Sequence, residues 1–300
     1  MKSSTIKNLV TAAVIIITLF LPVPPLARFG IPILIILYLL YSGRGTIWYY
    51  TALRAGGNRD HEKTLKFMLK ASRSKLSVER GCIVAISLLK YDKIEEAEQL
   101  FASLELMNNS SSQKKYLRSY LSLLFWQKGE REEAVSILEN LLKEDGHYRT
   151  THVYSTLGYF LLHSGNTERA FELNMEAVDY DPTPDIQDNL AASYIAADDW
   201  ENAEIICKKV IETKPAFSEA WYHAGIIAEH FGDFETADSH YKRSHRSIFS
   251  NLSLLKKNTV KEKIQEMRIQ LEKQNLLPDN SSPEEKPEIP ETKSENTPDE

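Results

Sequence analysis

An alanine that recurs in five similar stretches constrains this chain more than any other feature of its sequence. Successive copies lie 37, 36, 33 and 34 residues apart, at Ala97, Ala134, Ala170, Ala203 and Ala237. The stretch LGYFLLHSGNTERAFELNMEAVDYDP, residues 157–182, shows one unit in full. A period of this length is typical of helical hairpins that stack into an array, because no single unit can bury its own apolar face.

Each unit contains two apolar helix faces separated by a break. In the stretch quoted, Leu157 and Leu161 lie on one face of a first helix, and Gly165 breaks the chain. The small residues Gly158 and Ala170 allow the second helix to approach the first closely. The corresponding breaks in the other units are Gly129, Asp198 and Gly232. The pattern predicts an all-α fold made of helical hairpins.

The units resemble tetratricopeptide repeats, whose pattern has a bulky residue, Leu-Gly, an aromatic, alanines and a closing proline. The matching residues are Trp221, Gly225, Ala237 and Tyr241 in the last unit, and Leu190, Tyr194, Ala203 and Pro215 in the one before it. The resemblance covers five repeats over residues 78–250, with a degenerate sixth hairpin over 45–77. It implies an α-solenoid, and residues 107–115 are expected to form a longer loop between repeats.

Two uncharged apolar runs, residues 9–21 and 29–41, precede the repeats and are separated by prolines. They predict a membrane anchor over residues 1–44, formed by two short transmembrane helices in a hairpin. A cleaved signal peptide and a buried core hairpin are the alternatives.

The distribution of charge predicts the orientation of this anchor. Residues 1–75 carry eleven Lys and Arg against Asp60 and Glu62, and Arg28 is the one basic residue between the two runs. Because basic residues accumulate on the cytoplasmic side, the repeats should face the cytoplasm, as in an integral protein of a bacterial inner membrane. The basic stretch from Arg44 to Lys75 should then lie near anionic headgroups.

The chain after the repeats has two parts. Apolar residues at helix spacing predict a capping helix over residues 251–276, and the set comprises Leu252, Leu255, Val260, Ile264, Met267 and Leu271. Residues 277–300 are rich in Pro, Glu, Ser and Asn, and predict a disordered acidic tail.

The sequence carries little that indicates catalysis. It has no His-Glu-x-x-His motif and no Cys-x-x-Cys pair, and Cys82 and Cys207 are far apart, which indicates a reduced compartment. His223 and His230 share a helix, but a metal site would need Glu219 or Glu229 as further ligands. We expect no enzyme activity, no cofactor and no metal. The acidic middle and tail argue against a nucleic-acid partner.

A surface for binding protein remains. The resemblance implies that the first helices line a concave groove, where Ser155, Asp185 and Glu219 also lie. The predicted groove residues are Tyr116, Trp126, His152, Tyr159, His163, Asp188, Tyr222, Glu229 and His230. Aromatic side chains suit the capture of a peptide or helix, although packing against the next repeat is an equal alternative for Trp126. The Lys and Asn clamp of chaperone-binding members is absent.

The leading hypothesis is a membrane-anchored, cytoplasm-facing, non-catalytic adaptor or scaffold that binds a protein or peptide partner in this groove. One alternative is an outward-facing component of a secretion or cell-envelope assembly complex. A metal-dependent enzyme using His223 and His230 is a weaker alternative. Self-association through the groove or the short spans is also open.

Overall fold

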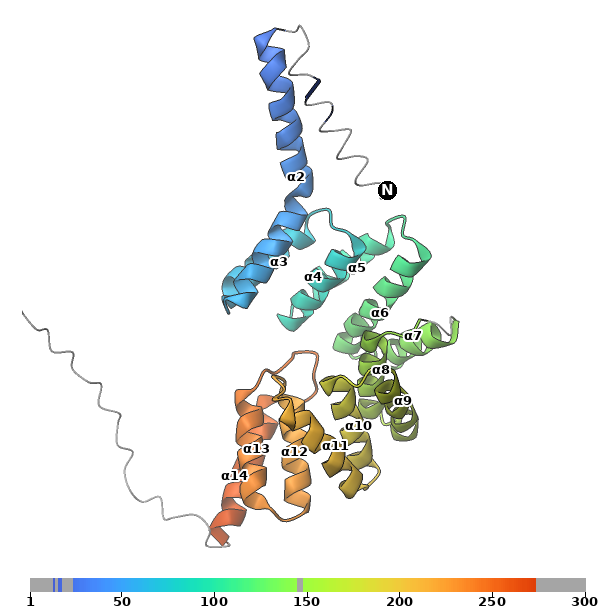
Figure 1. Cartoon of the computed structure of the whole chain (residues 1–300), viewed down its shortest axis with the longest axis vertical. Helices are drawn as coiled ribbons and strands as arrows, with labels where there is room; N and C mark the ends of the chain where they lie inside the picture. Colours follow the sequence, from blue (N-terminus) through green and yellow to red (C-terminus); the bar gives the residue numbers. More distant parts are fainter. Residues whose placement is uncertain (1–12, 14–15, 18–23, 145–147, 274–300) are drawn as a thin grey trace, which may run out of the picture.

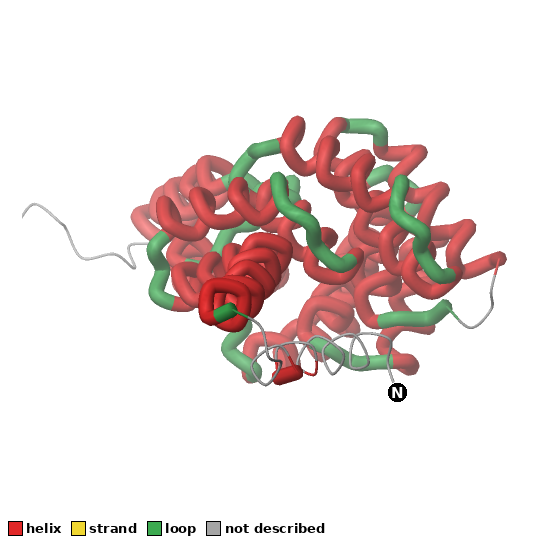
Figure 2. Tube along the Cα trace, turned by 90° about the horizontal axis from the view of Figure 1, so that it is seen from above, coloured by secondary structure: helices red, strands yellow, loops and turns green. Residues whose placement is uncertain are grey.

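The computed structural model describes residues 13, 16–17, 24–144 and 148–273. These residues form thirteen α-helices, which follow one another along a curved, superhelical stack (Figures 1 and 2). The predicted acidic tail, and all but three residues of the first apolar run, lie outside this part of the chain.

The stack consists of one pair of helices, then five hairpins, then one last helix. Helices α2 (Pro25–Gly57) and α3 (His61–Ser72) come first, and α14 (Lys257–Lys273) comes last. Between them lie five hairpins: α4 (Val78–Lys90) with α5 (Ile94–Glu105), α6 (Ser111–Lys128) with α7 (Arg131–Glu144), α8 (Thr151–His163) with α9 (Thr167–Tyr180), α10 (Pro184–Ala196) with α11 (Trp200–Glu212), and α12 (Ser218–His230) with α13 (Phe234–Arg246). The fold is therefore an all-helical, tetratricopeptide-like solenoid.

The repeating small residues allow this packing. All five anchor alanines, at 97, 134, 170, 203 and 237, are fully buried where the second helix meets the first. A Cβ atom at Gly225 would come within 2.5 Å of the Tyr241 ring, so only glycine allows the approach of α12 and α13 seen here. The break residues between the paired helices adopt positive φ, for example 85° at Gly129 and 57° at Asp198.

The second apolar run forms part of one long helix. Helix α2 continues unbroken from Pro25 to Gly57 and contains Pro32, so the predicted boundary at residue 44 falls inside a helix. Its C-terminal part packs against α3, where Ala52 is fully buried and the rings of Trp48 and Phe67 stack at 5.5 Å. The anchor and the first, degenerate hairpin therefore share a helix. The described residues hold one candidate membrane span, and the predicted transmembrane hairpin is not confirmed.

Two predicted boundaries were wrong. The stretch 107–115 is not a long loop, because α6 begins at Ser111 and the Ser110 side chain caps it in a reciprocal pair with Gln113. The capping helix begins at Lys257 rather than 251, so Leu252 and Leu255 lie in the preceding loop. Serine and asparagine in that loop, which form turns readily, account for the later start.

Candidate functional site

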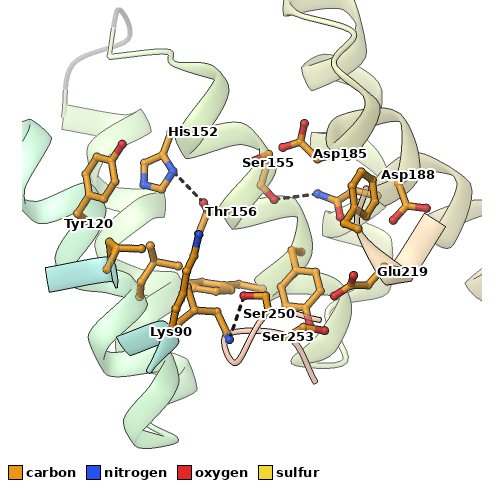
Figure 3. A pocket seen from close by; sticks show the side chains of 17 residues that line it. Lys90, Tyr120, His152, Ser155, Thr156, Asp185, Asp188, Glu219, Ser250 and Ser253 are labelled. Atoms are coloured by element: carbon orange, nitrogen blue, oxygen red, sulfur yellow. Dashed lines mark hydrogen bonds between the residues drawn. The ribbon is translucent and has the colours of Figure 1, made fainter. Parts of the chain in front are cut away.

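The first helix of each of the five hairpins lines the concave face of the solenoid. Together with the chain between α13 and α14, they enclose a cavity of about 480 Å³ (Figure 3). We call residues 247–256 the strap. The lining residues come from five helices and the strap. They are Ile86 and Lys90 of α4; Tyr120 and Leu123 of α6; His152, Ser155, Thr156, Tyr159 and Phe160 of α8; Asp185, Asp188 and Asn189 of α10; Phe217 and Glu219 at the start of α12; and Ser250, Leu252 and Ser253 of the strap.

One side of the cavity is formed by a stacked pair of rings. The imidazole of His152 lies parallel to the Tyr120 ring, with centroids 4.2 Å apart, and its Nδ1 is 3.3 Å from the Thr156 hydroxyl. Burial lowers the pKa of His152, although the carbonyl of Ser119 and the charge of Asp185 oppose the shift. At neutral pH this side therefore presents a neutral, flat aromatic surface.

The opposite side of the cavity carries three carboxylates, from Asp185, Asp188 and Glu219 (Figure 3). Asp188 is 4% exposed and its Oδ1 lies 2.8 Å from Nδ1 of His223. Burial opposes a charge on His223, but the carboxylates of Asp188 and Glu219 outweigh it and raise the pKa of His223. Asp188 is therefore paired, and Asp185, which is exposed, gives the mouth of the cavity its negative charge.

The strap closes the remaining side. The Tyr159 hydroxyl accepts a hydrogen bond from the backbone N–H of Leu254 at 2.7 Å, and the Asn251 amide donates to the carbonyl oxygen of Lys90 at 2.6 Å. Leu252 packs against the large apolar core that extends from α2 to α10. A loop from the end of the solenoid thus contacts its first and third hairpins.

Three of the nine predicted groove residues come together in the cavity: His152, Tyr159 and Asp188. Asp188 contributes mainly through its pair with His223. Burial raises the pKa of Tyr159, so at neutral pH its hydroxyl is protonated and holds the strap.

The other six predicted residues lie elsewhere. Trp126 is 4% exposed and stacks on Phe160 at 4.1 Å, so it packs between repeats, and its side chain is not part of the groove surface. Tyr116 packs against Tyr120, with ring centroids 4.7 Å apart. His163 is exposed and lies 4.2 Å from the Tyr159 ring.

The three predicted residues of α12 contact other helices. Tyr222 packs into the cluster that joins α12 and α13 to α14, and Glu229 accepts hydrogen bonds from Tyr241 at 2.6 Å and from Lys263 of α14 at 3.0 Å. The ring of His230 stacks on Trp200 of α11 at 3.8 Å. The terminal helix therefore covers part of the face that the repeat pattern assigned to the groove.

Sequence reasoning missed Lys90, Tyr120, Phe217 and the strap residues. Tyr120 falls outside the pattern positions that define the groove, and no signal pointed to it. Lys90 stands in the first repeat where Gln127 and His163 stand in the next two, at a groove position that was not assigned in that repeat. Leu252 was noticed, but as part of a helix. The serines and asparagine around it, read as a turn, could have indicated a loop.

His223 and His230 do not meet at a metal site. The first pairs with Asp188 and the second stacks on Trp200. Within the described ranges, no group of three His, Cys, Asp or Glu side chains is arranged to hold a metal ion.

Comparison with known proteins agrees with the helical hairpins described above. Residues 96–254, more than half of the chain, match the model of the Tetratricopeptide repeat protein 21 C-terminal ARM domain. The chain belongs to this family. The match begins in the second helix of the first repeat and ends within the strap. It therefore covers most of the repeat array and does not include the helices before it. No curated protein matches the chain.

Solved structures show the same fold. A tetratricopeptide repeat protein from Parabacteroides merdae is 13% identical, with a TM-score of 0.59 over 75% of this chain and 85% of that one. The pilF protein of Pseudomonas aeruginosa is 14% identical, with a TM-score of 0.52 over 75% of this chain and 97% of that one. Identities this low establish the arrangement of helices and nothing about partners.

Proposed function

We propose that this protein is a membrane-anchored, non-catalytic adaptor that binds a protein segment in the cavity on its concave face. Folds of this kind generally bind protein partners and are typically non-catalytic, which makes a scaffold the first function to consider. The observation that carries the proposal is the cavity itself. It combines an apolar, aromatic wall with a few polar groups from five different hairpins, and this combination is typical of specific binding sites.

The electrostatics of the cavity favour a neutral or basic segment. Asp185 and Glu219 have Lys90 as their counterpart across the cavity, whereas Asp188 is paired with His223. A Lys or Arg side chain entering beside Asp185 could also approach the ring of Phe217, where a cation is attracted to the aromatic face.

Helix α2 supports the membrane anchor. The apolar segment Phe29–Gly57 has 29 residues, and its most apolar 18-residue window has a mean hydropathy of 1.5 and is 11% buried within the protein. At a rise of 1.5 Å per residue it spans roughly 43 Å, more than the ~30 Å of a hydrocarbon core. The excess is the C-terminal part that packs on α3. The Arg44 guanidinium lies over the Tyr41 ring at 3.9 Å, a pairing suited to the membrane interface.

The adaptor role is tested by affinity capture of the full-length chain from detergent-solubilised membranes. The Asp185→Asn variant removes one carboxylate from the mouth of the cavity. The Glu168→Gln variant makes the same chemical change at an exposed site on α9, a second helix, and serves as the matched control. We expect one protein to be captured by the parent and the control and to be depleted with Asp185→Asn. Equal capture by all three would place binding outside the cavity.

Anchoring and orientation need separate measurements. The chain should stay with membranes after washing with high salt and carbonate, and a reporter fused after residue 275 should be active only in its cytoplasmic form. Release by salt would contradict the anchor, and an active periplasmic reporter would support the outward-facing alternative.

A further inference from the structure

The strap is the part of the cavity wall that the repeat array does not supply. The array binds it at three places: Asn251 to Lys90 on α4, Leu254 to Tyr159 on α8, and Ile248 to Phe217 beside α12. The first two are hydrogen bonds between residues 161 and 95 positions apart in the sequence.

The strap contacts the groove in the way a bound peptide would. Between Ser250 and Ser253 it forms a turn, since the N–H of Ser253 donates to the carbonyl of Ser250 at 3.0 Å. This turn presents Leu252 to the apolar core, a backbone N–H to the Tyr159 hydroxyl and a side-chain amide to a helix-end carbonyl. An apolar anchor with a few directed hydrogen bonds is a common mode of peptide recognition.

The attachments of the strap are weak compared with those of its ends. Both long-range hydrogen bonds are exposed to solvent, and Leu254 is 37% exposed. The ends are fixed independently, because Phe249 and Leu255, near the two ends of the strap, pack against the cluster in which Tyr241 of α13 and Val260 of α14 are fully buried. A segment with few buried contacts between two firm ends can detach while the helices stay packed.

We propose that the strap is an internal ligand of the groove, and that the partner is a protein segment with the same chemistry that displaces it. This inference rests on the proposed function. The partner segment would be a turn that carries a leucine, offers a free backbone N–H to Tyr159 and is flanked by basic residues.

Charge complementarity supports the last feature. From residue 239 to residue 261 the chain has no Asp or Glu, Lys256 ends the strap, and Lys257 follows it. The cavity that the strap covers carries Asp185 and Glu219 at its mouth. An acidic segment would be repelled at the same place.

Tethering gives the strap an advantage over a free segment of equal strength. A short linker holds a ligand at an effective concentration on the order of mM, so a free copy at μM concentration competes poorly. A partner must therefore bind more tightly than the strap, or the strap must first be released. The strap would act as a threshold that excludes weak ligands.

The test uses a fluorescent peptide with the sequence of residues 247–257, SIFSNLSLLKK, titrated against the detergent-solubilised full chain. The Asn251→Ala/Leu252→Asp variant should release the strap, because it removes one hydrogen bond and places a negative charge in the apolar contact that Leu252 makes with the core. We expect this variant to bind the peptide at least ~10-fold more tightly than the parent, given the competition from the tethered copy. Ile269→Asp, an apolar-to-acid change on the exposed side of α14, is the matched control and should bind like the parent.

Two further variants keep the result interpretable. Adding Tyr159→Phe to the released chain removes the hydroxyl that accepts the Leu254 N–H and should weaken peptide binding severalfold. Asn251→Ala alone, which leaves every apolar contact in place, should increase hydrogen exchange at the Leu254 amide while the amides of α12 and α13 stay protected. This second measurement does not depend on the double variant being folded.

The inference is overturned if the released chain keeps its helix content but binds the peptide no better than the parent. It is also overturned if Asn251→Ala exposes α12 and α13 together with the strap, because the strap would then be a structural part of the last repeat. Peptide binding without capture of any membrane or cytoplasmic partner would uphold the internal ligand and contradict the adaptor. Capture of a partner to the same extent with and without release of the strap would support the adaptor and contradict the internal ligand.

Discussion

Replacing Gly158 by alanine should destabilise the middle of the array, although alanine is the better helix former. Gly158 lies on α8 where it meets α9. A Cβ atom there would come within 2.9 Å of Cγ of Asn174, and closer still to its Oδ1. Asn174 is fully buried, and its Nδ2 donates to Ser193 Oγ at 2.9 Å and to the Asn189 carbonyl at 3.3 Å. The new methyl would therefore disturb the contact between two neighbouring repeats as well as one hairpin.

The magnitude follows from three contributions. Overpacking of a close-packed site costs about 1–3 kcal/mol. If Asn174 moves away, the buried groups that it leaves unpaired cost another ~1–3 kcal/mol. The helix gains about 1 kcal/mol from exchanging glycine for alanine. The free energy of unfolding should fall by roughly 3 kcal/mol, and a domain of this size would lose roughly 6–12 °C in Tm.

Thermal unfolding followed by far-UV circular dichroism measures this loss, and hydrogen exchange locates it in α8, α9 and α10. Adding Asn174→Ala removes the clash, so the two changes together should cost at least ~1 kcal/mol less than their sum. Gly57→Ala is the control, because a Cβ atom there meets nothing within 4 Å. A Gly158→Ala variant as stable as the parent would refute the view that a close helix approach sets this position.

Three further predictions concern the pH dependence, a helix cap and the thiols. The pKa of His223 is raised in the fold. Its pair with Asp188 therefore contributes stability that is full below about pH 6.5 and is lost as the pH rises through the raised pKa. In the Asp188→Asn variant, Tm measured by thermal unfolding should depend less on pH. Ser110→Ala removes the cap of α6 and should cost about 1 kcal/mol, seen as faster exchange in its first turn. Burial raises the pKa of Cys82 and Cys207 to about 12, so both thiols should resist a disulfide reagent at pH 8 until the protein is denatured, and rapid labelling of the folded chain would contradict their burial.

The array could be predicted because each unit repeats the same local solution. Burial of alanine at one position, a bulky residue opposite and a break at Gly129 or Gly165 recur at a fixed period, so every copy reinforces the assignment of the others. The repeat pattern of the degenerate first hairpin was weak, because one helix, α2, contains both the apolar candidate span and the first helix of the hairpin. Its N-terminal half exposes apolar side chains such as Leu34, whereas its C-terminal half buries Ala52 against α3. The apolar run ends before residue 44, but the helix continues through that position to Gly57.

The candidate site was harder to predict because a repeat pattern describes each unit relative to its own neighbours. It assigns both Tyr159 and Tyr222 to the groove, and one of these lines the cavity while the other lies under α14. What separates them is the packing of α14 and the strap, which follow the last repeat and lie outside its period. The same holds for Leu252, which follows the last repeat and packs against the core formed by the helices from α2 to α10.

This difference between local and long-range contacts bears on how the groove could be regulated. The helices of the array are held by interfaces that repeat along the stack, so losing one polar contact leaves the neighbouring interfaces intact. The strap is held to the first and third hairpins by two hydrogen bonds and one half-buried leucine, with no repeat of these contacts elsewhere among the residues described. Each such hydrogen bond contributes only about 0.5–1.5 kcal/mol net. A ligand that forms the same contacts, and enough additional ones to offset the tethering of the strap, would therefore displace it without disturbing a single helix–helix interface.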